Sequence, residues 1–403
     1  MELQKCRKLR NVQEINLDAL QIKKLIPVNS EIDLTRYDTV TSCKILYELS
    51  KKEYTFEKYK TTNNVPKKLL KVLYTCNQEK KIQDAIKQIT YANISRDLST
   101  EPSNKLYPSK YCKRVEKLFE EYPFVKVKIY NVADLEKMGM NLIVASGKGS
   151  TNNPYMCVIE MNPGKSNLCL VGKGVCFDAG GTDIKNSSYG MNVDKMGASF
   201  VVGIMKYLCD SSKYRKKSVI GILPLTENIV DGKAIKPGDI ITAYNKLTVE
   251  IVNTDAEGRL LLADALSYTC EKYNPTYIFD FATLTGDASV RHFAHSYMTY
   301  TENRNLTTLL SDVCEHKTGE RGIPISPWCE YMEYTKSLVA DVKNLSHGYY
   351  CGEFMAAMFL RNFIPTKYID NWVHFDLAHN ENSTIGKCSG IHSCIELVKY
   401  ILT

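Results

Sequence analysis

One eight-residue stretch, residues 253–260 (NTDAEGRL), constrains the fold of this chain more than any other. Apolar residues alternate with polar ones just before it, over residues 247–251, and an apolar run follows it over residues 260–266 (LLLADAL). Alternation with period two is typical of a strand with one buried face, whereas a long apolar run after a glycine is typical of a buried helix. The sequence therefore predicts a strand, a tight turn and a buried helix.

Three charged residues lie in the predicted turn, namely Asp255, Glu257 and Arg259. An unpaired charge beside a hydrophobic core costs several kcal/mol, so these side chains must pair with each other or with a metal ion. Taken alone, the stretch favours the simpler interpretation, in which one acid caps the helix and the other charges form a surface ion pair. A second stretch of the sequence reverses that preference.

This second stretch, residues 168–181 (LCLVGKGVCFDAGG), has a strand-like apolar run that leads to Lys173, Asp178 and paired glycines. Lys185 and Asp194 come next along the chain. Together the two stretches supply four carboxylates and two lysines at places where strands end in glycine-rich turns. Hard divalent cations prefer clustered carboxylate oxygens, and a two-metal site needs carboxylates that bridge the ions. The pattern therefore indicates a metal centre.

The motifs VGKGVCFDAGG, MNVDKMGA and NTDAEGRLLLADAL resemble those of the leucyl aminopeptidase family (peptidase family M17), whose members are two-metal exopeptidases. Further segments that resemble the family lie outside these motifs, at residues 96–108, 135–150, 235–242, 281–286 and 374–378. The resemblance runs in collinear order from about residue 80 to residue 403. It implies an enzyme that removes the N-terminal residue from short peptides.

The resemblance also implies a ligand set for two divalent metal ions in each subunit. One ion would be held by the side chains of Asp178, Asp255 and Glu257, and by the backbone carbonyl of Asp255. The other would be held by Lys173, Asp178, Asp194 and Glu257. A lysine binds a metal ion only as the neutral amine, which requires burial and nearby cations to lower its pKa. Spacing alone favours an ion pair between Lys173 and Asp178 instead. Zinc is the expected metal, and manganese and cobalt also suit such sites.

By the same resemblance, a water that bridges the metal ions would attack the scissile carbonyl, and Lys185 would stabilise the oxyanion that forms. Arg259 would hold a bicarbonate ion that relays protons, because a planar guanidinium matches a planar oxyanion. The free amine of the substrate would lie near Asp194. Substrate contacts are expected at Met191, Thr283, Leu284, Gly286 and Ala378. On sequence alone, residues 283–286 suit an ordinary strand-to-turn segment equally well.

Two positions depart from the family pattern. The segment between Lys185 and Asp194 is shorter than is usual in the family, so the loop that carries Asp194 must be built differently. Glu381 lies three residues after Ala378, at a position where the family often has an apolar side chain. We expect an acid there to weaken the selection of leucine and to favour polar or basic residues at the substrate N-terminus.

Strand-like and helical patterns alternate from about residue 104 onward, which predicts an α/β fold. We expect a C-terminal catalytic α/β/α sandwich, residues 79–403, with a mixed, largely parallel central sheet and a site beyond the carboxyl ends of its strands. Residues 1–78 are expected to form a smaller N-terminal α/β domain, truncated relative to the family, with a loop at residues 61–64. Helices are predicted at residues 43–49, 79–99, 111–121 and 199–208, and strands at residues 157–161, 168–171, 219–223, 248–252 and 277–281.

Composition limits the partners and the location of the protein. The formal net charge of +7 is spread over short Lys-rich segments, which favours a solvated surface over a nucleic-acid-binding face. The sequence shows no transmembrane span, residues 1–25 lack the apolar core of a signal peptide, and the 14 cysteines include no CxxC pair. We therefore expect a cytoplasmic protein with reduced, mostly buried cysteines. The resemblance adds a homohexamer as the expected assembly.

Two classes of function stay open: a metallo-aminopeptidase, and a non-catalytic scaffold or DNA-binding regulator with the same fold. A decayed enzyme is expected to have lost some of its carboxylates, because buried charges without a metal ion are costly. Every residue that the chemistry requires is present in this chain. Other catalytic patterns, HExxH, GxSxG and GxxxxGK[ST], do not occur, and His374 is interpreted as a packed core residue. The sequence therefore favours the enzyme.

Overall fold

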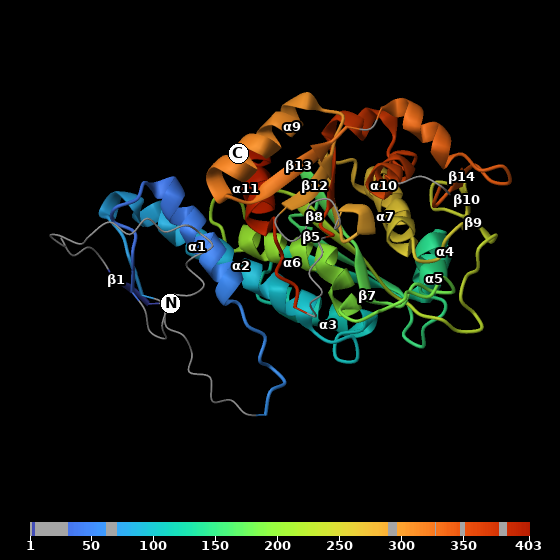
Figure 1. Ribbon diagram of the computed structural model, residues 1–403, viewed down its shortest axis with the longest axis horizontal. Coiled ribbons are helices and arrows are strands. Elements are labelled where there is room, and N and C mark those ends of the chain that lie inside the picture. Colours follow the sequence, from blue (N-terminus) through green and yellow to red (C-terminus); the bar gives the residue numbers. More distant parts are fainter. Residues whose placement is uncertain are drawn as a thin grey trace.

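A nine-stranded sheet forms the centre of the computed structural model, which describes residues 2–4, 31–61, 71–288, 296–326, 328–346, 351–378 and 385–403 (Figure 1). The strands follow the order β13 (Arg321–Ile325), β12 (Ser296–Tyr300), β15 (Trp372–Asp376), β11 (Tyr277–Ala282), β6 (Leu168–Gly172), β8 (Val219–Asn228), β5 (Tyr155–Met161) and β4 (Val125–Tyr130), with β7 (Gly174–Asp178) paired to β8. Strands β15, β11, β6, β8 and β7 run parallel, whereas β12 and β5 are antiparallel to their inner neighbours. The sheet is therefore mixed and largely parallel, as predicted.

Helices cover both faces of this sheet because its inner strands are apolar on both sides. In β6, Leu168 and Leu170 belong to one hydrophobic core, and Cys169 and Val171 belong to the other, as the alternation of side chains along a strand requires. The first core includes α2 (Glu79–Thr100), α3 (Pro108–Phe119), α6 (Met196–Cys209), α9 (Arg304–Ser311) and α11 (Ile391–Ile401). The second includes α4 (Val132–Met138), α5 (Asn141–Ser146), α7 (Glu257–Tyr273) and α10 (Gly352–Arg361). This is the predicted α/β/α sandwich.

A separate small core lies near the N-terminus of the chain. Its three-stranded parallel sheet has the order β1 (Glu2–Gln4), β3 (Lys71–Leu73) and β2 (Glu31–Asp33). Helix α1 (Thr39–Glu53) packs with it through Leu46 and Tyr47. Helix α2 contributes Ile82 to this small core and Leu98 to the first large core, so one continuous helix connects the two. The division into domains 1–78 and 79–403 stays a prediction.

Every helix and strand predicted from the sequence is present, with bounds that differ by a few residues. The segment 248–252 forms a strand as predicted, but this strand lies outside the central sheet. It is β10 (Thr248–Glu250), which pairs with β9 (Ile240–Thr242) and β14 (Val342–Lys343) in a small separate sheet. Helix α7 begins at Glu257 rather than near Leu260, because a carboxylate is favourable in the first turn of a helix. Of the predicted loop at 61–64, only Thr61 lies within the described residues.

Short helical turns complete the chain, namely η2 (Cys76–Gln78), η3 (Met191–Lys195), η5 (Asp312–Thr318), η6 (Cys329–Thr335) and η7 (Thr366–Asn371). In the described ranges, every helix is too short or too polar to cross a lipid bilayer. The cysteines of these ranges form no disulfide with one another, and eight of them are buried. Their burial agrees with the expectation from their apolar sequence neighbours.

Candidate active site

Lys173 lies at the break between β6 and β7, where its backbone is held from two sides. Its N–H donates to the carbonyl of Phe281 at 2.9 Å, and its carbonyl accepts from the N–H of Ala198 at 2.8 Å. Gly172 permits this close packing, because a Cβ at that position would lie 2.5 Å from the carbonyl oxygen of Gly197. The Lys173 side chain therefore leaves a well-anchored backbone.

Asp178 is the last residue of β7, and the chain turns sharply after it. Gly180 and Gly181 have φ values of +92° and +63°, which residues with a side chain rarely adopt. The turn lets the Gly180 N–H donate to Oδ1 of Asp178 at 2.9 Å. It also returns the chain toward the strand end, so that Nζ of Lys185 lies 2.9 Å from Oδ2 of Asp178 and pairs with Asp255 as well.

The first turn of α7 places two further charged side chains at the same end of the sheet. Glu257 and Arg259 are both buried there, and Asp255 lies in the turn just before the helix. The Asp255 N–H donates to Oδ1 of Asn253 at 2.7 Å, which stabilises that turn. Gly258 allows the helix to approach the strand, since a Cβ at Gly258 would lie only 2.6 Å from Cε of Lys173.

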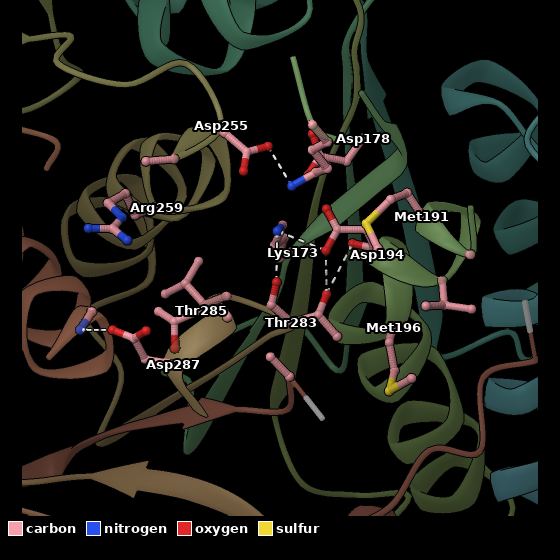
Figure 2. Close-up of a pocket in the computed structure, with 18 of the residues that line it drawn as sticks. Lys173, Asp178, Met191, Asp194, Met196, Asp255, Arg259, Thr283, Thr285 and Asp287 are labelled. Carbon is pink, nitrogen blue, oxygen red and sulfur yellow. Dashed lines mark hydrogen bonds and ion pairs between the residues drawn. The ribbon is translucent and has the colours of Figure 1, made fainter. Parts of the chain in front are cut away.

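Three buried carboxylates, those of Asp178, Asp194 and Glu257, meet at one point beside Lys173, and Figure 2 shows Asp178 and Asp194 next to this lysine. One oxygen of each of Asp178, Asp194 and Glu257 lies within 4.8 Å of the others. Nζ of Lys173 is 2.9 Å from Oδ1 of Asp194 and 3.1 Å from Oε1 of Glu257. Spacing alone favoured Asp178 as the partner of Lys173, whereas in the structure Lys173 pairs with Asp194 and Glu257. Four of the predicted ligands thus converge, and Asp255 joins them through Lys185.

Burial and repulsion between carboxylates shift the pKa values of Glu257 and Asp194 upward. Burial raises the pKa of Glu257 to about 8, with Asp178 adding to the shift and Lys173 opposing it. Burial likewise raises the pKa of Asp194 to about 6, and Lys173 again opposes the shift. For Lys173 itself, burial lowers the pKa, but the charges of Asp194 and Glu257 outweigh burial and raise it. Divalent cations in the cluster would reverse this direction, because they would repel an ammonium group.

The donor set fits a divalent metal ion. Oδ1 of Asp194 accepts from the hydroxyl of Thr283 at 2.6 Å, but Oδ2 is buried and has no hydrogen-bond donor among the described residues. A buried carboxylate oxygen without a partner is costly unless a cation binds it. Carboxylate oxygens with one amine nitrogen suit zinc, manganese and cobalt. Asp194, in the helical turn η3, is therefore well placed to be a ligand.

Asn228 was not identified from the sequence, although it contacts the centre of the cluster. It is the last residue of β8, and its Nδ2 donates to Oδ1 of Asp178 at 2.9 Å and to Oε2 of Glu257 at 3.2 Å. The carbonyl of Thr254 lies 3.1 Å from the same nitrogen. The only sequence signal for Asn228 is a polar residue at the end of an apolar strand. Asn228 orients the two carboxylates that are predicted to bridge.

Arg259 lines a cavity that opens over the carboxylate cluster. Its Nη1 donates to the carbonyl of Asn344 at 2.9 Å, while Nε is buried and has no acceptor among the described residues. Burial lowers the pKa of Arg259 to about 10, so the guanidinium stays protonated at neutral pH. A protonated guanidinium with an N–H donor that is not used within the described residues can bind a planar oxyanion.

A cavity of about 450 Å³ opens over the cluster, and every predicted substrate contact lines it: Met191, Thr283, Leu284, Gly286 and Ala378. Further lining residues that were not predicted as substrate contacts are Tyr189, Val193, Met196, Thr285, Asp287 and Ile385. They come from loops that are distant in sequence and meet where the parallel strands end. Glu381, the predicted determinant of side-chain preference, lies outside the described residues.

Asp376, at the end of β15, connects two of the segments that line the cavity. Its Oδ1 accepts from the N–H of Leu284 at 3.0 Å and from the N–H of Ala378 at 3.1 Å. Its Oδ2 accepts from the hydroxyl of Thr285 at 2.7 Å. Nearby on the same strand, His374 is buried with Nδ1 2.6 Å from Oδ1 of Asp280, as expected of a packed core histidine.

Comparisons with known proteins identify the family of this chain. The model of the "Cytosol aminopeptidase family, catalytic domain" matches residues 93–393. A relative from Persephonella marina named "Probable cytosol aminopeptidase" is 40% identical over 299 residues, covering 73% of this chain and 59% of the relative. A second, from Bradyrhizobium sp., is 39% identical and covers 71% and 56% of the two chains. The chain thus spans less than two thirds of the length of these relatives.

Longer alignments and solved structures extend the likeness. A relative of the same name from Haemophilus influenzae is 34% identical over 387 residues, which is 92% of this chain and 75% of the relative. A solved structure of the bottromycin maturation enzyme BotP in complex with Mn superposes with a TM-score of 0.84 at 25% identity, covering 96% of this chain and 86% of BotP. A second BotP structure superposes with a TM-score of 0.83 at 24% identity, which supports the fold.

Proposed function

The chain belongs to the cytosol aminopeptidase family, and from this premise we propose that it is a metallo-aminopeptidase that removes the N-terminal residue from short peptides. The observation that carries the proposal is the buried cluster of Asp178, Asp194 and Glu257 around Lys173, at the base of a cavity large enough for a small peptide. Buried charges of this density are retained where they bind a metal ion or perform chemistry.

We infer that the cluster holds two divalent ions. One would bind Asp178, Glu257 and both the side chain and carbonyl of Asp255, and the other would bind Lys173, Asp178, Asp194 and Glu257. Bound there, the ions would supply Lewis acidity and an activated water. The unpartnered Oδ2 of Asp194 and the hydrogen bonds of Asn228 support this assignment. Zinc stays the expected metal, with manganese and cobalt as alternatives; the solved BotP structure is a complex with Mn.

The side chains around the cluster have separate roles in the proposed reaction. The charges of Asp178, Glu257 and Asp255 outweigh burial and raise the pKa of Lys185, so its ammonium can donate to the oxyanion that develops on the scissile carbonyl. Arg259 would hold a bicarbonate ion as proton relay, using Nε, which has no acceptor among the described residues. The backbone of residues 283–286 would align the peptide, and the free amine would lie near Asp194.

We propose a cytoplasmic homohexamer as the working assembly. Exposed apolar side chains support self-association: Trp328, Tyr334, Leu338 and Val339 lie within one short segment next to β14, and Leu338 is fully exposed. Ile240 is also exposed on β9, in the same small sheet as β14. Exposed apolar side chains gathered in this way are typical of a surface that another chain covers.

The proposal is tested with metal-stripped protein and leucyl-aminomethylcoumarin, with Zn²⁺ or Mn²⁺ added back. We expect turnover only with metal, and its loss in Lys185→Ala and Glu257→Ala. Lys233→Ala and Glu116→Ala, which change exposed residues outside the cavity, serve as matched controls and should behave as wild type. Turnover that survives Glu257→Ala, or a protein inactive with every metal, would contradict the proposal. A salt-sensitive shift of DNA mobility in the inactive case would favour the scaffold instead.

A further inference from the structure

One acid in the cavity, Asp287, has no role in the metal cluster. The cluster acids are each matched by a lysine: Lys173 pairs with Asp194 and Glu257, while Lys185 pairs with Asp178 and Asp255. Asp287 also lines the cavity, yet among the described residues no lysine, arginine or histidine lies within ion-pair distance of it. Asp287 is therefore a negative charge that the described chain leaves uncompensated inside a substrate cavity.

Asp287 is held in place without being neutralised. Its Oδ2 accepts from the N–H of Gly352, the first residue of α10, at 2.5 Å. Gly352 leaves room for this contact, because a Cβ there would lie 2.7 Å from the same oxygen. The hydrogen bond uses one carboxylate oxygen and fixes the side chain, and the carboxylate is half-buried. A fixed, partly desolvated carboxylate binds a cation more strongly than a mobile surface acid does.

The position of Asp287 indicates what it contacts. It directly follows residues 283–286, the segment proposed to align the peptide backbone, and Figure 2 shows its carboxylate across the cavity from Lys173 and Asp194. A Cβ built at the adjacent Gly286 would meet no atom within 4 Å beyond its chain neighbours, so the space beside Gly286, which also lines the cavity, is open. A peptide whose free amine lies at Asp194 would therefore extend a side chain toward Asp287.

We propose that Asp287 is a specificity-determining residue that recognises a lysine or arginine side chain of the peptide substrate. The inference rests on the proposed aminopeptidase function and deepens it by naming a substrate class. It differs from the prediction for Glu381, because it depends on a carboxylate in the loop after β11. The charge of the substrate side chain defines the class, and the experiment below decides which peptide residue carries it.

A simpler role for Asp287 is to anchor the N-terminus of α10. Two variants separate the roles. Asp287→Asn keeps an acceptor for the Gly352 N–H and removes the charge, whereas Asp287→Ala removes both. Asp231→Asn is the matched control: Asp231 is exposed outside the cavity and its carboxylate likewise accepts a backbone N–H, from Lys233 at 2.8 Å. If anchoring is the whole role, Asp287→Asn should keep the substrate preferences of wild type.

The test compares kcat/KM for Lys-Leu, Leu-Lys and Leu-Leu dipeptides with metal-loaded protein. In Asp287→Asn we expect the ratio of one lysine-containing peptide to Leu-Leu to fall about tenfold, the loss of one charge-assisted hydrogen bond. A fall for Lys-Leu assigns the contact to the N-terminal residue, and a fall for Leu-Lys assigns it to the second. Asp231→Asn should leave all three values unchanged. Unchanged ratios in both Asp287 variants would overturn the proposal.

Calorimetric binding of the corresponding reduced-amide dipeptides, which cannot be cleaved, gives the same comparison without turnover. This arm keeps the two proposals distinguishable. A protein without activity that still loses its preference for the lysine analogue in Asp287→Asn would refute the enzyme and support the role of Asp287. An active protein whose affinities for the lysine and leucine analogues change equally would support the enzyme and refute the role of Asp287.

Discussion

Asn228 donates a hydrogen bond from Nδ2 to Oδ1 of Asp178 over 2.9 Å, between two residues that pair in register at the ends of strands β8 and β7. The same amide reaches Oε2 of Glu257 at 3.2 Å. One neutral side chain therefore sets the orientation of both carboxylates that are predicted to bridge the metal ions. Hydrogen bonds of this kind commonly tune the affinity of a metal site.

Replacing Asn228 with alanine should weaken metal binding. The expected loss of Mn²⁺ affinity is about 10-fold to 100-fold, because the two carboxylates lose the donor that orients them. Calorimetric titration of the metal-stripped protein measures it. Asn141→Ala is a suitable control, since the Asn141 side chain donates to the carbonyl of Thr242 and, within the described residues, to no group of the metal cluster. Wild-type affinity in a folded Asn228→Ala protein would show that the acids hold their orientation unaided.

Gly258→Ala should abolish most activity while leaving the helix intact. A Cβ at Gly258 would lie within 2.8 Å of Cδ, Cε and Nζ of Lys173, so the lysine must move away from Asp194 and Glu257. Displacement of a positioned group by about 1 Å can lower the rate 100-fold. Alanine itself favours a helix over glycine by about 1 kcal/mol. Loss of kcat/KM with unchanged circular dichroism is the expected result.

Gly232→Ala is the matched control for this change, because a Cβ at exposed Gly232 meets nothing within 4 Å. The control should retain the kinetic constants and the circular dichroism spectrum of wild type. If Gly258→Ala retained them as well, the position of Lys173 would have no bearing on turnover.

Asp376→Ala should raise KM more than it lowers kcat. The change removes the acceptor for the N–H groups of Leu284 and Ala378 and for the hydroxyl of Thr285, so the walls of the cavity lose their shared anchor. An effect of about tenfold on KM is expected from unsatisfied buried donors. Asp376→Asn should recover part of it, because the amide can still accept from a backbone N–H and donate to the hydroxyl.

Steady-state kinetics on both Asp376 variants decides between positioning and simple stability. Asp341→Ala is the control: its carboxylate accepts from the N–H and hydroxyl of Thr248 at 2.8 and 2.7 Å in a similar pattern, on the exposed surface. A drop in thermal stability without any change in KM would show that Asp376 supports the fold alone.

His392 should make the protein less stable as the pH falls below 6.5. Burial, with the charges of Arg96 and Lys51, lowers the pKa of His392 well below 6.5. The unfolded chain therefore binds a proton in this range that the folded chain excludes, so the free energy of unfolding decreases with falling pH. The decrease contributed by this group is at most about 1.4 kcal/mol per pH unit.

His392→Phe should remove this contribution. The phenyl ring can keep the stacking contact of His392 with Tyr47 of α1, where the ring centroids are 4.0 Å apart. Melting temperatures measured between pH 5 and pH 8 should then vary less in the variant than in wild type, and His316→Phe, at an exposed histidine, should follow wild type. Parallel curves for all three proteins would assign the pH dependence to other groups.

Much of the fold could be predicted because the periodicity of each segment depends on the faces that it buries. The 79–99 pattern corresponds to α2, which ends at Thr100 just before Pro102, and the apolar run at 168–171 corresponds to β6 with both faces covered. The position of β10 could not be predicted, since a three-residue strand carries no information about which sheet it joins. Its partners β9 and β14 are set by non-local pairing.

The sequence by itself determined which chemical groups the candidate site contains: the carboxylates, the lysines and the arginine occur in short collinear motifs that place each residue type on a strand end or a helix start. Only the tertiary structure decided which partners those groups have. Asn228 and Asp376 reach their hydrogen-bond partners because Asn228 of β8 pairs with Asp178 of β7, and because β15 pairs in register with β11. Asp287 lies in the cavity because α10 meets the loop after β11. Such neighbours arise from strand order and register, which are set by the packing of the whole chain rather than by local sequence.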